Sequence, residues 1–282
     1  MSMPFPFLRV CTLAFSLVLS ACVAHVNERS LIHPMPGAAL SEAISPDGRW
    51  QIHQIHIARG EAELNGALFS RADAKALKLY FPGNSFVLSE DYTNVLAIYD
   101  ALPVDVLILD FRGYGASTGV ASIDGLISDA LPEYDYARAL PHYIGRPVIV
   151  HGHSLGSFMA GAVAQQRKID ALILESSATT AEEWVQGFVD ASLLIRRGVV
   201  EGNLQGKGNL AVMATLNEPV LFVVGEKDET TRSAMSTKLF EAAKVPAAMK
   251  ELLIVPGAGH NNATADPRFR SAFLRLIAAA TR

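Results

Sequence analysis

A serine with a glycine two positions to either side is the first sign of chemistry in this sequence. Residues 152–156 read Gly-His-Ser-Leu-Gly, directly after the apolar run 147–150 and before a run of small residues that extends to Ala164. In this order of strand, sharp turn and helix, a G-x-S-x-G sequence exposes its serine oxygen on a strained turn. We therefore predict that Ser154 is a nucleophile, because a positioned base can activate a serine hydroxyl for covalent catalysis.

A serine nucleophile needs a base, and a histidine base needs an acid that fixes its tautomer and stabilises its cation. His260 is the predicted base, because it follows the last apolar run on a loop that contains Gly257 and Gly259. Asp228 is the predicted acid, because it follows the preceding apolar run in the sequence Gly-Glu-Lys-Asp. The order along the chain is then serine, acid, histidine.

Other acidic and histidine residues offer alternatives. Glu175 also follows an apolar run and is the second candidate for the acid, whereas Glu226 and Glu229 are expected to be solvated. His151 and His153 are two positions apart, as metal ligands can be, but no third ligand is evident in the sequence. We therefore predict no metal site.

The oxyanion that forms when a carbonyl group is attacked needs backbone donors aimed at it. One predicted donor is the amide of Leu155, the residue after the nucleophile, and the second should come from the loop after an earlier strand. In this chain that loop spans residues 81–85. The amide of Asn84 is the predicted second donor and Ser85 is its neighbouring candidate. A Pro-Gly turn without a chemical role is the alternative interpretation.

The elements that would position these residues follow from the apolar pattern. Two segments, 50–57 and 62–69, are expected to form an antiparallel pair, and later short apolar runs suit parallel strands buried on both faces. Alternation of such strands with helices predicts an α/β fold, whose chemistry gathers beyond the carboxyl ends of the strands. The later strands are expected at 77–81, 104–109, 148–150, 171–174, 220–224 and 252–255, and helices at 90–102, 123–144, 155–166, 234–242 and 267–280.

The segment 177–217 breaks this alternation. It carries bulky apolar residues such as Trp184 and Phe188, and then a glycine-rich stretch over 198–208. Because it is too long for a simple connection, we predict a small helical cap over the site. A surface helix packed on the fold is the alternative.

Residues 1–21 are predicted to be a signal peptide. Arg9 precedes the apolar stretch 10–19, which is too short to span a bilayer and is typical of a signal-peptide core. An ordinary secretory signal is one interpretation.

Residues 19–22, Leu-Ser-Ala-Cys, resemble the lipobox of bacterial lipoproteins. The resemblance implies cleavage before Cys22 and acylation of its thiol, so that the lipid anchors the protein in the membrane of the bacterial envelope. Val23 follows this cysteine, which favours the outer membrane, facing the periplasm, over the inner membrane.

Residues 22–48 would then connect lipid and domain. Pro34, Pro36, Gly37 and Pro46 interrupt regular structure there, and we predict a flexible tether that spans roughly 25–30 Å. The domain itself is expected at 49–282, with hydrophobic residues making up 50% of the chain, enough for one large α/β domain. A net charge of −4 without a basic run argues against nucleic acid as a partner.

Five motifs give the chain a resemblance to the α/β-hydrolase superfamily, and to its monoacylglycerol-lipase-like, serine-aminopeptidase-like and depalmitoylating branch. The resemblance covers nearly all of residues 50–282, and it implies a mostly parallel central sheet covered by helices on both faces, with a cap insertion. The chain departs from the family at Pro82, where a histidine usually stands. The motifs are 81–84, 110–119, 152–156, 225–228 and 256–260.

The resemblance implies hydrolysis of a small acyl substrate through an acyl-enzyme on Ser154, without an organic cofactor or metal. His260 would take the serine proton and later activate water, and Asp228 would orient His260. Carboxylic esters or thioesters are the expected substrates. A peptidase or amidase with the same three residues is the first alternative, and a catalytically silent envelope-binding protein is the second.

Overall fold

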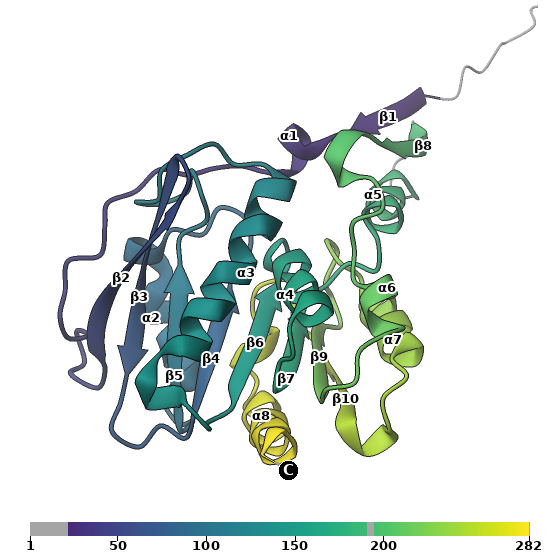
Figure 1. Ribbon diagram of the computed structural model, residues 1–282. Coiled ribbons are helices and arrows are strands. Elements are labelled where there is room, and N and C mark those ends of the chain that lie inside the picture. Colours follow the sequence, from purple (N-terminus) through teal and green to yellow (C-terminus); the bar gives the residue numbers. More distant parts are fainter. Residues whose placement is uncertain (1–21, 191–194, 282) are drawn as a thin grey trace, which may run out of the picture.

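The computed structural model describes residues 22–190 and 195–281 of the chain (Figure 1). The signal peptide predicted for residues 1–21 lies outside the described residues. Within the described part, eight strands form one sheet in the order β10-β9-β7-β6-β4-β5-β3-β2. These strands are β2 (Gln51–Arg59), β3 (Ala62–Ser70), β4 (Ala76–Phe81), β5 (Val104–Leu109), β6 (Val148–His153), β7 (Ala171–Glu175), β9 (Val220–Gly225) and β10 (Lys250–Val255).

The sheet is parallel from β10 to β5 and antiparallel over β5, β3 and β2. Every residue of β4, β5 and β9 is buried, as expected for strands covered on both faces. The continuous apolar runs therefore predicted the central strands correctly, and the antiparallel pair at the edge is confirmed.

Helices cover both faces of this sheet. The helices α3 (Ile123–Ala139), α4 (Gly156–Gln166) and α7 (Ser233–Ala242) share one apolar core with Val150 of β6. The helices α2 (Leu88–Tyr99) and α8 (Pro267–Ala280) share the opposite core with Ile149. Neighbouring residues of β6 thus face opposite layers, as the pleat of a strand requires. The chain has the predicted α/β-hydrolase fold.

Two helices end earlier than predicted. The helix expected over 90–102 is α2, which ends at Tyr99. The helix expected over 123–144 ends at Ala139, and Leu140 is extended with φ −61° and ψ 120°. The ring of Pro141 explains this end, because proline disfavours helical backbone at the residue before it.

The segment predicted as a helical cap contains a strand as well as helices. It comprises α5 (Ala181–Asp190), β8 (Ile195–Val200), a 3₁₀ turn (Gly202–Leu204) and α6 (Leu210–Met213). β8 pairs in parallel with β1 (Cys22–Val26), far away in the sequence, and Figure 1 shows the two side by side. A Cβ atom on Gly198 would lie 2.5 Å from Cγ1 of Val185, so this strand packs tightly on α5.

The structure corrects the prediction of a free tether over residues 22–48. β1 joins the cap, α1 (Glu28–Leu31) follows it, and Pro36 then forms a β-bridge with Gly115. Ile32 is buried in the apolar core that α3, α4 and α7 share, and this burial stabilises the docked position of the segment. Below, residues 27–37 are called the strap.

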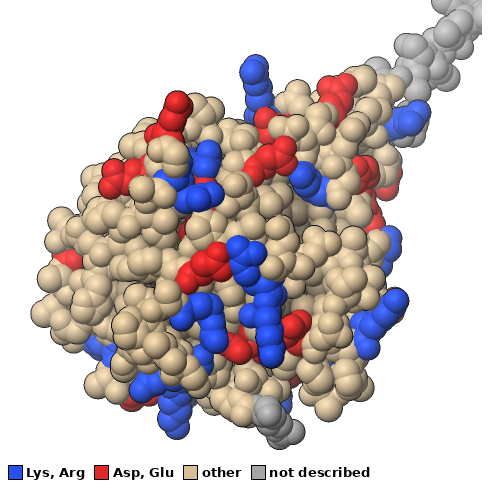
Figure 2. Space-filling view, viewed as in Figure 1, with Lys and Arg blue, Asp and Glu red and all other residues tan. Residues whose placement is uncertain are grey.

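Figure 2 shows acidic and basic side chains interspersed on one face of the molecule, without a broad area of either sign among the residues drawn in colour. Within the described residues, none of the helices combines the length and the apolar character that crossing a membrane requires.

Candidate active site

Ser154 lies on a turn with a strained backbone, which close packing around it stabilises. It follows β6 directly and has a φ of 52°, in the left-handed region where a residue other than glycine is strained by about 1–3 kcal/mol. A Cβ atom on Gly152 would lie 2.4 Å from the Gly156 carbonyl oxygen, and one on Gly156 would lie 2.1 Å from that of Phe81. Both glycines are therefore needed for the close packing of strand, turn and helix.

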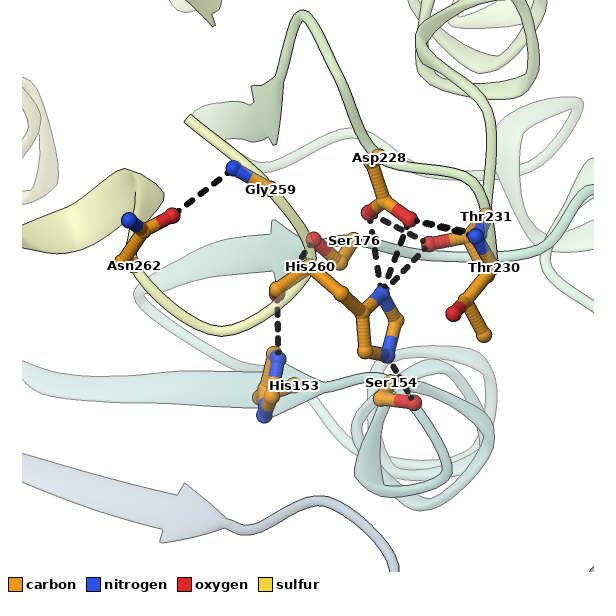
Figure 3. A network of polar contacts seen from close by, with 9 residues as sticks. All are labelled: His153, Ser154, Ser176, Asp228, Thr230, Thr231, Gly259, His260 and Asn262. Carbon is orange, nitrogen blue, oxygen red and sulfur yellow. Dashed lines mark hydrogen bonds and ion pairs between the residues drawn. The ribbon is translucent and has the colours of Figure 1, made fainter. Parts of the chain in front are cut away.

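A continuous line of hydrogen bonds joins the three residues predicted to form a triad (Figure 3). The hydroxyl Oγ of Ser154 lies 2.8 Å from Nε2 of His260, and Nδ1 of His260 lies 2.9 Å from Oδ2 of Asp228. Because a carboxylate only accepts hydrogen bonds, Nδ1 carries the proton and Nε2 is left to accept from the serine. The structure thus brings together residues from three loops, each at the carboxyl end of a strand.

The acid of this line is fixed and ionised. Oδ1 of Asp228 accepts from the backbone amides of Thr230 and Thr231, at 2.9 and 2.8 Å, and Oδ2 accepts from the Thr231 hydroxyl at 2.9 Å. Burial raises the pKa of Asp228, but the hydrogen bond and charge of His260 and the Thr231 amide lower it more, and the net pKa lies below the ordinary value. Thr231 was not predicted from the sequence, because nothing in its spacing distinguishes it from any loop threonine.

The loop that carries His260 is held through its own backbone. The carbonyl oxygen of His260 accepts from Nε2 of His153 and from the Ser176 hydroxyl, both at 3.1 Å, and the amide of Gly259 donates to Asn262 at 2.8 Å (Figure 3). The sequence drew attention to His153 only as a possible metal ligand. Its position beside the nucleophile was the available signal for this different role.

Glu175, the alternative acid, serves a separate buried cluster. Its carboxylate accepts from Nε2 of His151 at 3.1 Å and from the Thr264 hydroxyl at 2.9 Å. Burial lowers the pKa of His151 to about 4, so this ring is neutral near pH 7, and its Nδ1 accepts from the Tyr99 hydroxyl at 3.1 Å. Among the described residues, no cluster of three or more His, Cys, Asp or Glu side chains could hold a metal ion.

The two predicted oxyanion donors lie beside the nucleophile. Asn84 and Leu155 line the same cavity as Ser154. Within the described part of the chain, neither backbone amide has an acceptor. Both N–H groups are thus available to a ligand, and their role stays a prediction.

The cavity over Ser154 has a volume of about 590 Å³. The cap, the loop 81–85, the strap and helix α2 all contribute residues to its lining. A second cavity of about 510 Å³ lies beyond His153 and Tyr80, which line both. The first cavity's apolar lining includes Leu31, Val95, Leu155, Phe158, Ala178 and Trp184.

The sequence of this chain is similar to those of several known proteins. A family model described as alpha/beta hydrolase fold matches residues 89–205. An uncharacterized protein of Mycobacterium tuberculosis is 32% identical over 161 residues, which cover 57% of this chain and 54% of that protein. The lysophosphatidylserine lipase of Mus musculus is 33% identical over 118 residues, 40% of this chain and 29% of the lipase. The chain thus spans about half the length or less of these relatives.

A solved structure extends the likeness over most of the chain. The esterase Pf2001 of Pyrococcus furiosus matches with a TM-score of 0.66 at 16% identity, covering 86% of this chain and 97% of the esterase. At this identity the likeness is one of fold. The family model and the solved structure thus agree on the fold of this chain, which is the α/β-hydrolase fold.

Proposed function

We propose that this protein is a serine hydrolase that cleaves carboxylic esters through an acyl-enzyme on Ser154. The line of hydrogen bonds from Ser154 through His260 to Asp228 carries the proposal. A serine that donates to a histidine, itself oriented by a buried carboxylate, is equipped for acyl transfer.

In the proposed reaction, Ser154 Oγ attacks the ester carbonyl carbon while His260 Nε2 takes the hydroxyl proton. The tetrahedral oxyanion accepts hydrogen bonds from the amides of Leu155 and Asn84. His260 then gives its proton to the departing alkoxide, and the acyl group stays on Ser154. Water attacks this ester in turn, with His260 again taking and returning the proton, and Asp228 stabilises the imidazolium in both steps.

The cavity favours an acyl group as the part of the substrate that it holds. Its volume is within the range of small-molecule sites, and Leu31, Phe158 and Trp184 give it apolar walls. Names among the relatives, an esterase and a lysophosphatidylserine lipase, agree with ester substrates. Thioesters present the same carbonyl and belong to the same proposal.

Lipid anchoring at Cys22 is a further proposal, and it rests on residues 19–22 alone. Because β1 begins at Cys22 and pairs with β8, a lipid there would hold the cap side of the domain close to the membrane, facing the periplasm at the outer membrane. Detergent partition of wild type and Cys22→Ser tests it. A wild type that partitions into the aqueous phase would contradict anchoring.

Labelling with a fluorophosphonate probe tests the hydrolase proposal. The wild type should be labelled, whereas Ser154→Ala should not, and His260→Ala should react far more slowly. Turnover of p-nitrophenyl butyrate against an aminoacyl anilide then separates ester hydrolase from peptidase. A well-folded wild type that is not labelled would contradict the proposal and favour a silent binding protein.

A further inference from the structure

The loop that carries the predicted oxyanion donor Asn84 has few means of holding itself. Pro82 has no backbone N–H group and Gly83 has no side chain, so neither can fix the loop by a polar side-chain contact. Asn84 is the first loop residue after β4 whose side chain can do so. What this side chain binds therefore decides where its own backbone amide lies.

Every polar group of the Asn84 carboxamide is engaged, mostly by the strap. Nδ2 donates to the Leu31 carbonyl oxygen at 2.5 Å and to Nδ1 of His33 at 3.0 Å. Oδ1 accepts from the His33 backbone amide at 3.1 Å, from the Tyr114 hydroxyl at 2.8 Å and from the Ser85 amide at 3.1 Å. An amide side chain offers two N–H donors and one oxygen with two lone pairs. Both donors are therefore used, and the three donors around Oδ1 leave it no acceptor capacity to spare.

The strap itself is fastened independently of Asn84. At its start, the Glu28 carboxylate accepts from the Ile123 amide at 3.0 Å, at the first turn of α3. At its end, Gly37 and Gly115 are joined through the Gly37 amide and the Gly115 carbonyl at 2.8 Å. Between these points Ile32 is 7% exposed in the core. The strap is thus a fixed frame on which the side chain of Asn84 is held.

We propose that the strap is part of the active site, and that Asn84 and His33 are positioning residues that fix the oxyanion loop through the carboxamide of Asn84. The inference rests on the proposed function. Preorganised donors stabilise a transition state because they need not reorient when charge develops. A loop released from the strap would keep the Asn84 amide but lose its fixed direction.

Variants of Asn84 test the proposal without removing the backbone donor. Asn84→Ala deletes all contacts with the strap, and Asn84→Asp keeps the size but places a carboxylate oxygen against the Leu31 carbonyl. We expect kcat for p-nitrophenyl butyrate to fall about 10- to 100-fold in both variants. This loss is no larger than the loss of kcat expected when an oxyanion-hole donor is removed altogether. KM should change less than about threefold. Asn217→Ala, an exposed asparagine outside the cavity, is the matched control and should retain wild-type kcat.

The variants Tyr114→Phe and His33→Ala distinguish the contacts that Asn84 makes with the strap from its contact with Tyr114. Tyr114→Phe removes a bond to Asn84 that does not come from the strap and should lower kcat less than His33→Ala does. Hydrogen exchange of the backbone over residues 81–86 should quicken in Asn84→Ala and His33→Ala while the Tm stays near that of the wild type. This exchange readout does not depend on turnover.

Two results would overturn the inference, and they differ from failure of the proposed function. Unchanged exchange and unchanged kcat in Asn84→Ala, with an active wild type, would show that the strap does not position the loop. A wild type that neither turns over esters nor reacts with the phosphonate would instead refute the proposed function, and the catalytic meaning of the strap with it.

Discussion

His153 donates its Nε2 proton to the backbone carbonyl oxygen of His260 at 3.1 Å, so the residue before the nucleophile holds the loop that carries the base. The bond ties β6 to the loop after β10, across the sheet. It fixes the backbone of His260, whereas Asp228 fixes its ring. Nucleophile and base are thereby kept in register by two separate contacts.

His153→Ala should lower kcat for a short ester by about tenfold, because even a small misplacement of a reacting group slows the reaction strongly. Ester turnover and KM measured on purified protein check this. His53→Ala is the control, since His53 is exposed on β2 and bonds Ser70 instead. Equal kcat in His153→Ala and the control would show that the contact is dispensable.

Asp228→Asn should lower kcat by about 10³- to 10⁴-fold, because an amide no longer enforces the proton on Nδ1 of His260. Glu175→Gln should lower kcat by less than about tenfold but reduce the free energy of unfolding by about 1–3 kcal/mol, since it leaves buried amide protons without acceptors. Ester kinetics and urea unfolding of both variants distinguish the two carboxylates. A larger kinetic loss in Glu175→Gln would reverse their assignment.

Much of this site could be predicted from the sequence because its parts are local. The elbow at Ser154 needs only the glycines around it, and Asp228 and His260 each follow an apolar run that marks a strand. The strap and β8 could not be predicted. β1 pairs with residues more than 170 positions away, and Asn84 meets Leu31 through side-chain and backbone contacts that leave no periodic pattern. Prolines and glycines there indicated a tether, although such residues also suit a docked segment without regular structure.

Lys78→Met should stabilise the protein. Lys78 is fully buried, with Nζ 3.8 and 3.7 Å from the ring centroids of Tyr80 and Tyr99 and without a hydrogen-bond acceptor among the described residues. Burial of a polar group without such a partner opposes folding by about 1–3 kcal/mol. Urea unfolding at pH 7 should therefore give a larger free energy of unfolding for the variant. Lys75→Met, at an exposed position, should leave it unchanged.

The Lys78→Met variant should also change how the free energy of unfolding depends on pH. Burial lowers the pKa of Lys78 well below its ordinary value of 10.5. At pH values between the lowered pKa in the folded protein and the ordinary pKa in the unfolded chain, the unfolded chain binds more protons than the folded one. The free energy of unfolding of the wild type therefore rises with pH in this range. Lys78→Met should flatten that rise in the alkaline range below pH 10.5, by at most about 1.4 kcal/mol per pH unit. Parallel curves for wild type and variant would mean that Lys78 stays protonated in the fold.

Trp184→Ala should change the acyl-chain preference. Trp184 reaches the cavity from α5, and the ring of Phe188 packs edge-on against it with centroids 5.0 Å apart. A chain that fills the cavity gains about 0.8 kcal/mol for each methylene buried, so loss of this wall should reduce kcat/KM for an octanoate ester by about tenfold. The acetate ester, too short to reach the wall, should change less than about twofold. Phe188→Ala, which removes only the outer support of Trp184, should give an intermediate loss, and an equal fall for acetate and octanoate would contradict a role of the cap in chain selection.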